Sequence, residues 1–280
     1  MKKILVTGSE GKLGREIVRL LKTSNYEVLG IDLLKGETTD EIIDIRDGNE
    51  TKEITKDIDA IIHTAALHGK HTDLNYSRDK FISTNIIGTN NLLSASVQNG
   101  INKFLYTSTT SIYGNAMVNN KQAVWVDEKL IPVPRDIYDI TKLTCELLCK
   151  DYYEKEGIET TVLRVSRFLH EDENTKANHR IYRGLDEEDG AKGHQLALEK
   201  KFKSFEIFNI SNDSPFNKED LVELYTDPKK VICKYYPEAE YYYAKHNWKF
   251  QDRIDRVYSI EKAKKELNYK PIKNFDTFIK

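Results

Sequence analysis

The segment YDITK places Tyr138 and Lys142 four residues apart, a spacing that puts both side chains on one face of a helix. A tyrosine with a pKa near ~10 is a weak base at neutral pH. A lysine ammonium one turn away favours the phenolate, and the pair is then suited to proton transfer. The same spacing also arises by chance on ordinary amphipathic helices, so the surrounding sequence must decide between the two interpretations.

A glycine-rich turn near the N-terminus predicts a second functional feature. TGSEGKLG follows the apolar segment KKILVT, and Gly8, Gly11 and Gly14 match the pattern G-x-x-G-x-x-G. Between a strand and a helix, such glycines allow a tight turn, close approach of the backbone to a pyrophosphate and close helix–sheet packing. The helix N-terminus, which begins around Lys12 and Leu13, supplies free N–H groups for phosphates. The turn therefore predicts a dinucleotide site.

Asp32 ends the second strand-like segment, EVLGID. A carboxylate about 20 residues after the glycine turn accepts hydrogen bonds from the adenosine ribose of a dinucleotide. It also repels a 2′-phosphate, so NAD is favoured over NADP, although Lys35 nearby weakens that preference.

The elements that must position these residues alternate along the chain. Strands are expected at KKILVT, EVLGID, DAIIHTA, NKFLYTS, TTVLRVS and FEIFNI, and helices at GKLGREIVRLLKTS and at residues 79–99 and 136–156. Gly100 and Gly157 are placed to end the last two helices. Short apolar strands that alternate with helices predict an α/β fold with a doubly wound parallel sheet, the Rossmann architecture.

The pattern loosens after residue 167. HEDENTKANHR and DEEDG are expected to be irregular, LALEKKFKS and SIEKAKKEL to be helical, and FEIFNI to rejoin the sheet. We therefore predict an NAD-binding domain over residues 1–167, to which residues 190–212 return. Residues 168–189 and 213–280 are expected to form a small C-terminal lobe that binds substrate.

Composition narrows the function classes. Charged residues make up 31% and hydrophobic ones 39% of the 280 residues, and the net charge is −2 without a basic stripe, so no nucleic-acid partner is expected. No segment reaches the apolar length of a signal peptide or a membrane span, which favours a cytoplasmic protein without a membrane partner. Cys145 and Cys149 are interpreted as core residues, and the two histidines of HGKH are not expected to bind a metal.

Taken together, these motifs resemble the extended short-chain dehydrogenase/reductases of the NAD-dependent epimerase/dehydratase family, over nearly the whole chain. The resemblance rests on the following segments: TGSEGKLG, Asp32, DIRD (44–47), IIHTAA (61–66), STNIIGT, YTSTTSIYG (106–114), YDITK, LRVSR (163–167), FNIS and RVYSIEKAKKELNYKP. It implies further cofactor contacts. Asp44 and Ile45 would lie at the adenine, Thr64, Ala65 and Ala66 would line the dinucleotide, Asn85 would brace the active-site strand, and Ser108 would face the cofactor. His63 is expected to be structural.

The resemblance also assigns the catalytic groups. Tyr138 would exchange a proton with a substrate hydroxyl while hydride moves between the substrate carbon and NAD. Lys142 would also hold the nicotinamide ribose. Thr109, four residues before Tyr113, would hydrogen-bond the reacting oxygen.

The reaction within the family is narrowed by departures from its patterns. Sugar dehydratases carry Asp-Glu after the catalytic Thr, and decarboxylating relatives carry Glu two residues before the Tyr of the YG pair; Thr110 and Ser111 stand at these positions here. Nucleotide-sugar epimerases place Asn where this chain has Arg167, which could bind a phosphate or a carboxylate. Arg180 and Arg183 are further possible anion contacts, with a solvated loop as the alternative.

Three functions remain open. The first is an NAD-dependent epimerase or oxidoreductase acting on a sugar nucleotide or related sugar. The second is a dehydrogenase of a small free sugar acid or hydroxy compound, as in uronate dehydrogenases of similar length. The third is a non-catalytic NAD-sensing protein. Apolar stripes on the helices at 79–99 and 136–156 suggest a homodimer, because relatives pair these helices, although both stripes could instead be covered by the sheet.

Overall fold

A computed structural model describes residues 1–168 and 172–280, and its centre is a seven-stranded sheet in the order β3-β2-β1-β4-β5-β7-β8. Every neighbouring pair of strands runs parallel. This topology confirms the predicted doubly wound sheet. The strands are β1 (Lys3–Thr7), β2 (Glu27–Asp32), β3 (Glu41–Ile42), β4 (Ala60–His63), β5 (Lys103–Thr109), β7 (Glu159–Val165) and β8 (Glu206–Ile210).

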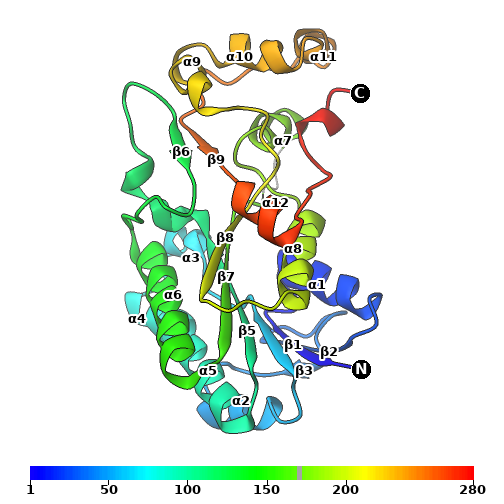
Figure 1. The fold of residues 1–280 in the computed structure, drawn as a ribbon, viewed down its shortest axis with the longest axis vertical. Helices are drawn as coiled ribbons and strands as arrows, with labels where there is room; N and C mark the ends of the chain where they lie inside the picture. The colour runs from blue at the N-terminus through cyan, green and yellow to red at the C-terminus, as the bar shows by residue number, and fades with distance from the viewer. Residues whose placement is uncertain (169–171) are drawn as a thin grey trace.

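Helices cover both faces of the sheet (Figure 1). One apolar core lies between the strands and three helices, α1 (Lys12–Lys22), α8 (Glu187–Glu199) and α12 (Glu261–Leu267). The other lies beneath α5 (Gly88–Asn99) and α6 (Ile137–Glu156), with α2 (Gly48–Ile54) beside α5. Cys145 and Cys149 are fully buried in this second core, as expected. Strands buried on both faces explain the continuous apolar runs of the sequence.

The predicted ends of the long helices are confirmed. Asp136 caps α6 by accepting a hydrogen bond from the Asp139 amide at 2.9 Å. Gly157 and Gly100 end α6 and α5 in the left-handed region, with φ of 74° and 72°. The start of α6 is therefore fixed one residue before Tyr138.

The helix predicted at 79–99 is not uniform. It consists of α4 (Arg78–Phe81), a π-helical segment (Ile82–Ile87) and α5. Asn85 lies in the π segment, where its amide donates to Leu67 O at 3.0 Å and to Thr141 Oγ1 at 2.9 Å. Its Oδ1 accepts from the Leu67 amide at 2.8 Å. Asn85 therefore ties the chain after β4 to α6, and a 3.6-residue periodicity carries no signal for such a local widening.

Two segments predicted to be irregular are helical. Residues 172–180 of HEDENTKANHR include α7 (Glu173–Arg180), and DEEDG contains the start of α8; His170 and Glu171 lie outside the described residues. Asp172 and Asp186 cap these helices by accepting from the amides of Thr175 and Glu188. The face of α8 that packs on α1 contains glycine, and a Cβ at Gly190 would lie only 3.0 Å from Leu13 Cδ1. Because small residues form this face, it gives no apolar periodicity in the sequence. The predicted helix LALEKKFKS in turn ends at Glu199.

The C-terminal residues build a separate apolar core. β6 (Val124–Val126) pairs in parallel with β9 (Arg256–Tyr258), and α7, α9 (Leu221–Thr226), α10 (Pro228–Tyr235) and α11 (Ala239–Lys245) pack with this pair (Figure 1). α12 confirms the helix predicted at SIEKAKKEL, but it packs on the sheet core although its residues were assigned to the C-terminal lobe. The division into a cofactor domain and a substrate lobe stays a prediction.

Short elements complete the described chain. They are α3 (Gly69–Asp73) and the single 3-10 turns Thr110–Tyr113, Asn115–Met117, Lys218–Asp220 and Phe275–Thr277. Within residues 1–168 and 172–280, no helix combines the length and apolar character needed to cross a bilayer.

Candidate active site

A cleft of about 1090 Å³ opens at the carboxyl ends of the sheet strands. It runs from the glycine-rich turn after β1, past the ends of β4 and β5 and the start of α6, to the C-terminal core. Almost all predicted site residues line it, namely Gly8, Gly11, Lys12, Leu13, Gly14, Asp32, Asp44, Ile45, Thr64, Ala65, Ala66, Ser108, Thr109, Tyr138, Lys142, Arg167 and Arg183. Asn85 is the exception, since it braces the wall from behind.

The glycine-rich turn has the geometry of a phosphate cradle. Gly8 has φ of +70°, and a Cβ there would lie 2.7 Å from the Ala65 amide nitrogen. A Cβ at Gly14 would lie 2.0 Å from Gly8 O, so α1 packs directly on the turn. Gly11 caps α1 without a side-chain hydrogen bond, which leaves the first amides of the helix facing the cleft without a side-chain cap.

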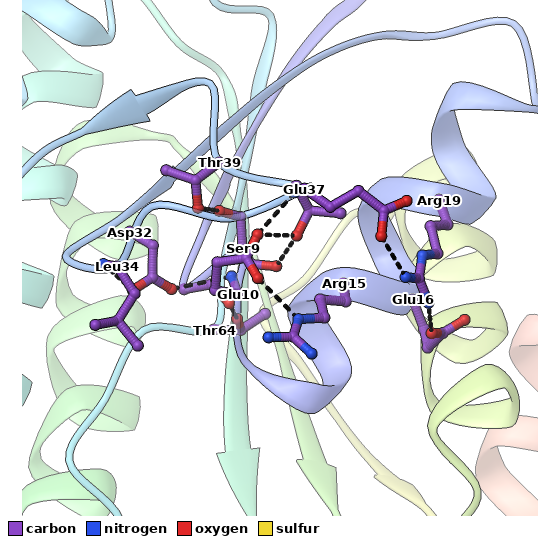
Figure 2. Close-up of polar contacts among 12 residues, drawn as sticks. Ser9, Glu10, Arg15, Glu16, Arg19, Asp32, Leu34, Glu37, Thr39 and Thr64 are labelled. Atoms are coloured by element: carbon purple, nitrogen blue, oxygen red, sulfur yellow. Dashed lines mark hydrogen bonds and ion pairs between the residues drawn. The ribbon is translucent and has the colours of Figure 1, made fainter.

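Asp32 is held in place by two backbone amides. Its Oδ2 accepts from the Glu10 amide and its Oδ1 from the Leu34 amide, each at 3.0 Å (Figure 2). Each carboxylate oxygen keeps a further lone pair for a ligand hydroxyl. The end of β2 therefore presents a fixed negative charge at the cleft.

Glu10 organises the loop after β2, a role that the sequence did not reveal. Its carboxylate accepts from the Thr38 amide at 2.7 Å, from Thr38 Oγ1 at 2.8 Å and from Arg15 Nε at 2.9 Å. The hydrogen bonds from Thr38 lower the pKa of this carboxyl, so Glu10 is ionised. Figure 2 shows Glu10 between Asp32 and Arg15. Glu10 thus holds Asp32 through its backbone amide, while its carboxylate is paired with Arg15.

The middle of the cleft is formed by residues after β3 and β4. The carboxylate of Asp44 accepts from Arg46 Nε at 2.9 Å, and this pairing lowers its pKa. Thr64 Oγ1 donates to Thr7 O at 2.7 Å. His63 lies below, with Nδ1 2.7 Å from Thr7 Oγ1 and Nε2 3.0 Å from Thr89 Oγ1. Burial lowers the pKa of His63 to about 3, which supports its structural interpretation.

Thr109, Tyr138 and Lys142 meet beside one another at the end of β5. Thr109 and Tyr138 both line the cleft, and the Thr109 hydroxyl lies close enough to the phenol to act against the rise in the pKa of Tyr138. Lys142 Nζ donates to Thr107 O at 2.6 Å and lies 4.2 Å from the centre of the Tyr106 ring. The helical spacing and the strand end therefore bring the three predicted groups to one place.

The two ionisable groups of this trio are both shifted by burial. Burial lowers the pKa of Lys142 to about 8. It raises the pKa of Tyr138, and the nearby Asp139 and Asp136 add to the rise. The sequence predicted that Lys142 would lower the pKa of Tyr138, but in the protein alone desolvation of the phenolate outweighs such an effect.

Ser108 uses its hydroxyl inside the protein. It donates to Glu146 Oε1 at 2.5 Å, and Glu146 Oε2 is paired with Arg164 Nη2 at 2.7 Å. Arg164 Nη1 in turn donates to Tyr113 Oη at 3.0 Å, and Tyr113 donates to Asn209 Oδ1 at 2.8 Å. Ser108 thus begins a buried polar chain behind Thr109, and because it also lines the cleft its predicted contact with a cofactor stays a prediction.

Three arginines line the far end of the cleft. Arg167 and Arg183 lie on adjacent backbone, joined by the Arg167 amide and Arg183 O at 3.4 Å. Arg183 Nη2 contacts His179 Nε2 at 2.7 Å. Arg256 at β9 is the third, and no role was predicted for it although it begins the quoted segment RVYSIEKAKKELNYKP. The cluster provides a positive end for an anionic group.

Arg180 does not belong to this cluster. It is paired with Asp186 Oδ2 at 3.0 Å and donates to Lys273 O at 2.7 Å. Its suggested anion contact is thus replaced by a structural ion pair. Among the described residues, no group of three or more His, Cys, Asp or Glu side chains is arranged to hold a metal ion.

Fold and cleft together define a doubly wound α/β protein with a dinucleotide-type phosphate turn and a Tyr-x-x-x-Lys pair. Residues 4–187 match the family described as NAD dependent epimerase/dehydratase family. Because the match covers more than half of the chain, this protein belongs to that family, which confirms the resemblance seen in the sequence.

Individual relatives are more distant. The chain is 28% identical to GDP-mannose 3,5-epimerase 1 of Oryza sativa subsp. indica over 59% of its length, and it spans about half of that protein, 46%. In structure it resembles UDP-N-acetylglucosamine 4-epimerase from Bacillus cereus (24% identity, TM-score 0.74, 100% of this chain and 97% of the other). It also resembles a mutated uronate dehydrogenase (17%, TM-score 0.69, 99% and 84%). At these identities the two structures support the fold alone.

Proposed function

We propose that this protein is an NAD-dependent epimerase or oxidoreductase acting on a sugar nucleotide or a related sugar. One observation carries the proposal: Thr109, Tyr138 and Lys142 line the middle of a cleft that has a glycine-rich turn at one end and three arginines at the other. The turn would bind the dinucleotide, the three residues would act at a hydroxyl-bearing carbon, and the arginine end would bind an anionic part of the substrate.

The cofactor end fits NAD. Without a Cβ at Gly8 and Gly14, the turn packs against Ala65 and the first helix packs on the turn, and the amides at the start of α1 would bind the oxygens of a pyrophosphate. Asp32 would hold the adenosine ribose. The negative charge of Asp32, which the Glu10 amide holds in place, opposes a 2′-phosphate, and NADP is therefore disfavoured.

Tyr138 would carry the proton and Thr109 would hold the reacting oxygen. NAD, when bound, supplies a hydride acceptor at the substrate carbon. The Tyr138 phenolate would take the proton of the substrate hydroxyl and return it in the reverse direction. Because the pKa of Tyr138 is raised by burial, a bound positive ring and the Lys142 ammonium would both be needed to favour phenolate.

The arginine cluster favours a sugar nucleotide. Arg256 is already paired with Asp255 through Nε and Nη2, but Arg167 and Arg183 lie on adjacent backbone and could each bind one phosphate of a diphosphate. A dehydrogenase of a small free sugar acid is the second candidate, supported by Arg167 in the place where nucleotide-sugar epimerases carry Asn. A non-catalytic NAD sensor would not require the Thr109–Tyr138 contact.

Incubation with NAD and a panel of UDP-glucose, UDP-N-acetylglucosamine and glucuronate separates these functions. Isomer formation without net NADH indicates an epimerase, whereas NADH accumulation indicates a dehydrogenase. Turnover of none of the panel, with NAD bound, would leave the sensor as the better interpretation.

Replacing Tyr138 tests the assigned proton carrier. We expect Tyr138→Phe to lower kcat by ~10²- to 10⁴-fold, because it removes the acid–base group and leaves the ring. NAD binding, measured by calorimetry, should stay within about two-fold. Tyr153→Phe is the matched control, since its hydroxyl donates to Lys203 O at 2.8 Å away from the cleft. Unchanged turnover in Tyr138→Phe contradicts the mechanism.

We further propose a cytoplasmic homodimer. The outer surface of α5, α6 and the π segment exposes apolar side chains that the sheet does not cover, namely Ile87, Val97, Ile140 and Leu147. A second copy could cover them by pairing the same helices. The three free cysteines suit a reducing compartment.

A further inference from the structure

Ser111 lies in the cleft next to the proposed reaction centre. It belongs to the 3-10 turn Thr110–Tyr113 that follows β5, and it lines the cleft together with Thr109 and Tyr138. Its amide donates to Thr109 Oγ1 at 3.1 Å. Ser111 therefore lies next to the place where Thr109 and Tyr138 would hold the reacting oxygen of the substrate.

The hydroxyl of Ser111 is bonded to Asp139, the residue after Tyr138. Ser111 Oγ donates to Asp139 Oδ1, while Asp139 Oδ2 accepts from the Arg135 amide at 3.2 Å and lies 3.6 Å from Arg135 Nε. Asp139 is fully buried and does not itself line the cleft. Burial raises the pKa of this carboxyl, and the bonds from Ser111 and Arg135 act against that rise.

This pairing sets the hydrogen-bonding polarity of Ser111. Both carboxylate oxygens act as acceptors toward Ser111 and Arg135, so the single proton of Ser111 Oγ is directed at Asp139. A serine oxygen whose proton is committed in this way offers only lone pairs to a ligand. It would bind a hydroxyl or amide N–H donor and would disfavour a carboxylate or phosphate oxygen.

We propose that Ser111 is a substrate-binding residue that accepts a hydrogen bond from a donor group of the sugar close to the reacting carbon, and that Asp139 is the positioning residue that fixes this polarity. The proposal rests on the proposed function and deepens it. It assigns the anionic groups of the substrate to the arginine end of the cleft and a sugar hydroxyl to the middle of the cleft, where Ser111 lies.

The alternative is that the Ser111–Asp139 bond only holds the turn after β5 against α6. The two possibilities differ in what the variants do to KM. Loss of a turn contact lowers the melting temperature and affects all substrates alike. Loss of a substrate contact acts on one substrate hydroxyl alone.

The test uses the full-length protein with NAD and whichever member of the panel UDP-glucose, UDP-N-acetylglucosamine and glucuronate it turns over, together with the monodeoxy analogues of that sugar. For the wild type we expect one deoxy analogue to lose ~10- to 100-fold in kcat/KM, the range for a hydrogen bond that involves a charged partner network. Ser111→Ala should lose a similar factor on the parent sugar, mostly in KM, and should no longer distinguish that analogue from the parent.

Asp139→Asn should act in the same direction, because an amide no longer requires the serine proton and the polarity of Ser111 is lost. Ser111→Thr keeps the hydroxyl and should restore KM to within about three-fold of the wild type. Asp151→Asn, which removes an exposed carboxylate from the same helix, is the control and should leave KM and NAD binding unchanged.

The outcomes are distinguishable. Equal discrimination of the deoxy analogues by wild type and Ser111→Ala, with turnover intact, overturns the Ser111 contact and leaves the proposed function standing. If Asp139→Asn distinguishes the deoxy analogue from the parent sugar as strongly as the wild type does, the positioning role of Asp139 is overturned. A wild type that binds NAD but turns over none of the panel overturns the proposed function and the Ser111 contact with it.

Discussion

Lys142 is a buried ammonium, and at the scale of single residues its burial has a measurable effect on stability. Its pKa falls to about 8 in the folded protein from an ordinary value near ~10.5. Below pH 8 the lysine is charged in both the folded and the unfolded state, so the unfavourable burial of the charge is present in full. Between pH 8 and about 10 the folded state releases this proton first, and the unfolded state then binds more protons.

We therefore expect the contribution of Lys142 to the free energy of unfolding to increase as the pH rises from 8 to 10. Urea unfolding of the wild type and of Lys142→Met across this range measures it, because the difference removes the titration of other groups. The free energy of unfolding of the wild type minus that of Lys142→Met should therefore increase as the pH rises from 8 to 10. A difference that is constant over this range contradicts the assigned pKa.

Glu10 makes a second prediction at the residue scale. Its ionised carboxylate accepts from Thr38 and is paired with Arg15, so Glu10→Gln keeps the side-chain shape but leaves the Arg15 charge uncompensated near the loop that follows Asp32. We expect the preference for NAD over NADP, measured as the ratio of dissociation constants, to fall by ~3- to 10-fold, as for one partly screened charge. Glu16→Gln on the exposed side of α1 is the control. An unchanged ratio would show that Asp32 alone sets the preference.

At the scale of elements, α6 and β7 are joined by a buried ion pair. Glu146 and Arg164 are 3% and 4% exposed; Glu146 also accepts from Ser108, and Arg164 also donates to Tyr113. Removing one partner leaves the other charge buried without compensation, which typically costs about 3–5 kcal/mol. The intact pair therefore adds little net stability, but the loss of either partner is strongly destabilising.

We expect Glu146→Gln to lower the free energy of unfolding by about 3 kcal/mol, and the double variant Glu146→Met/Arg164→Met to recover much of that loss. Chemical denaturation measures both. Lys150 and Glu154 on the same helix form an exposed pair at 3.7 Å, and Lys150→Ala should change stability by less than about 1 kcal/mol. A double variant less stable than Glu146→Gln would contradict the argument from uncompensated charge.

At the scale of the whole molecule, the exposed apolar side chains on α6 and the neighbouring helix predict association. Leu147 is 61% exposed and Ile140 49%. A charge at Leu147 would be buried on dimer formation without a partner, so Leu147→Glu should shift the sedimenting species from dimer to monomer. Val222→Glu on α9 introduces the same charge at a residue 57% exposed outside that surface and should leave the dimer intact. A wild type that sediments as a monomer contradicts the proposed homodimer.

The cleft is also a property of the whole molecule, because its two ends are built from distant parts of the chain. Gly8 and Asp32 come from the first two strands, whereas Arg256 comes from β9, which pairs with β6 in the C-terminal core. The site between them is complete only when that core lies over the carboxyl ends of β5 and β7.

Local sequence patterns were enough to predict the main alternating strands and helices, the parallel sheet, the phosphate turn at Gly8 and the Tyr138–Lys142 pair. These features depend on local periodicity, on helical spacing and on backbone conformations that glycine allows, all of which are legible over a few residues. The family followed from the same local motifs in their order.

Only the tertiary structure decided which side chains meet. The Ser111–Asp139 bond, the commitment of Ser108 to Glu146 and the place of Arg256 in the cleft join residues from separate elements. α7 and the first part of α8 were missed for the same reason, since their packing faces are made by small and polar residues whose partners lie elsewhere in the chain. Periodicity in the sequence indicates which face of a helix or strand is buried. It does not indicate which other element packs on that face, and the hydrogen-bond donors and acceptors that line this cleft depend on that packing.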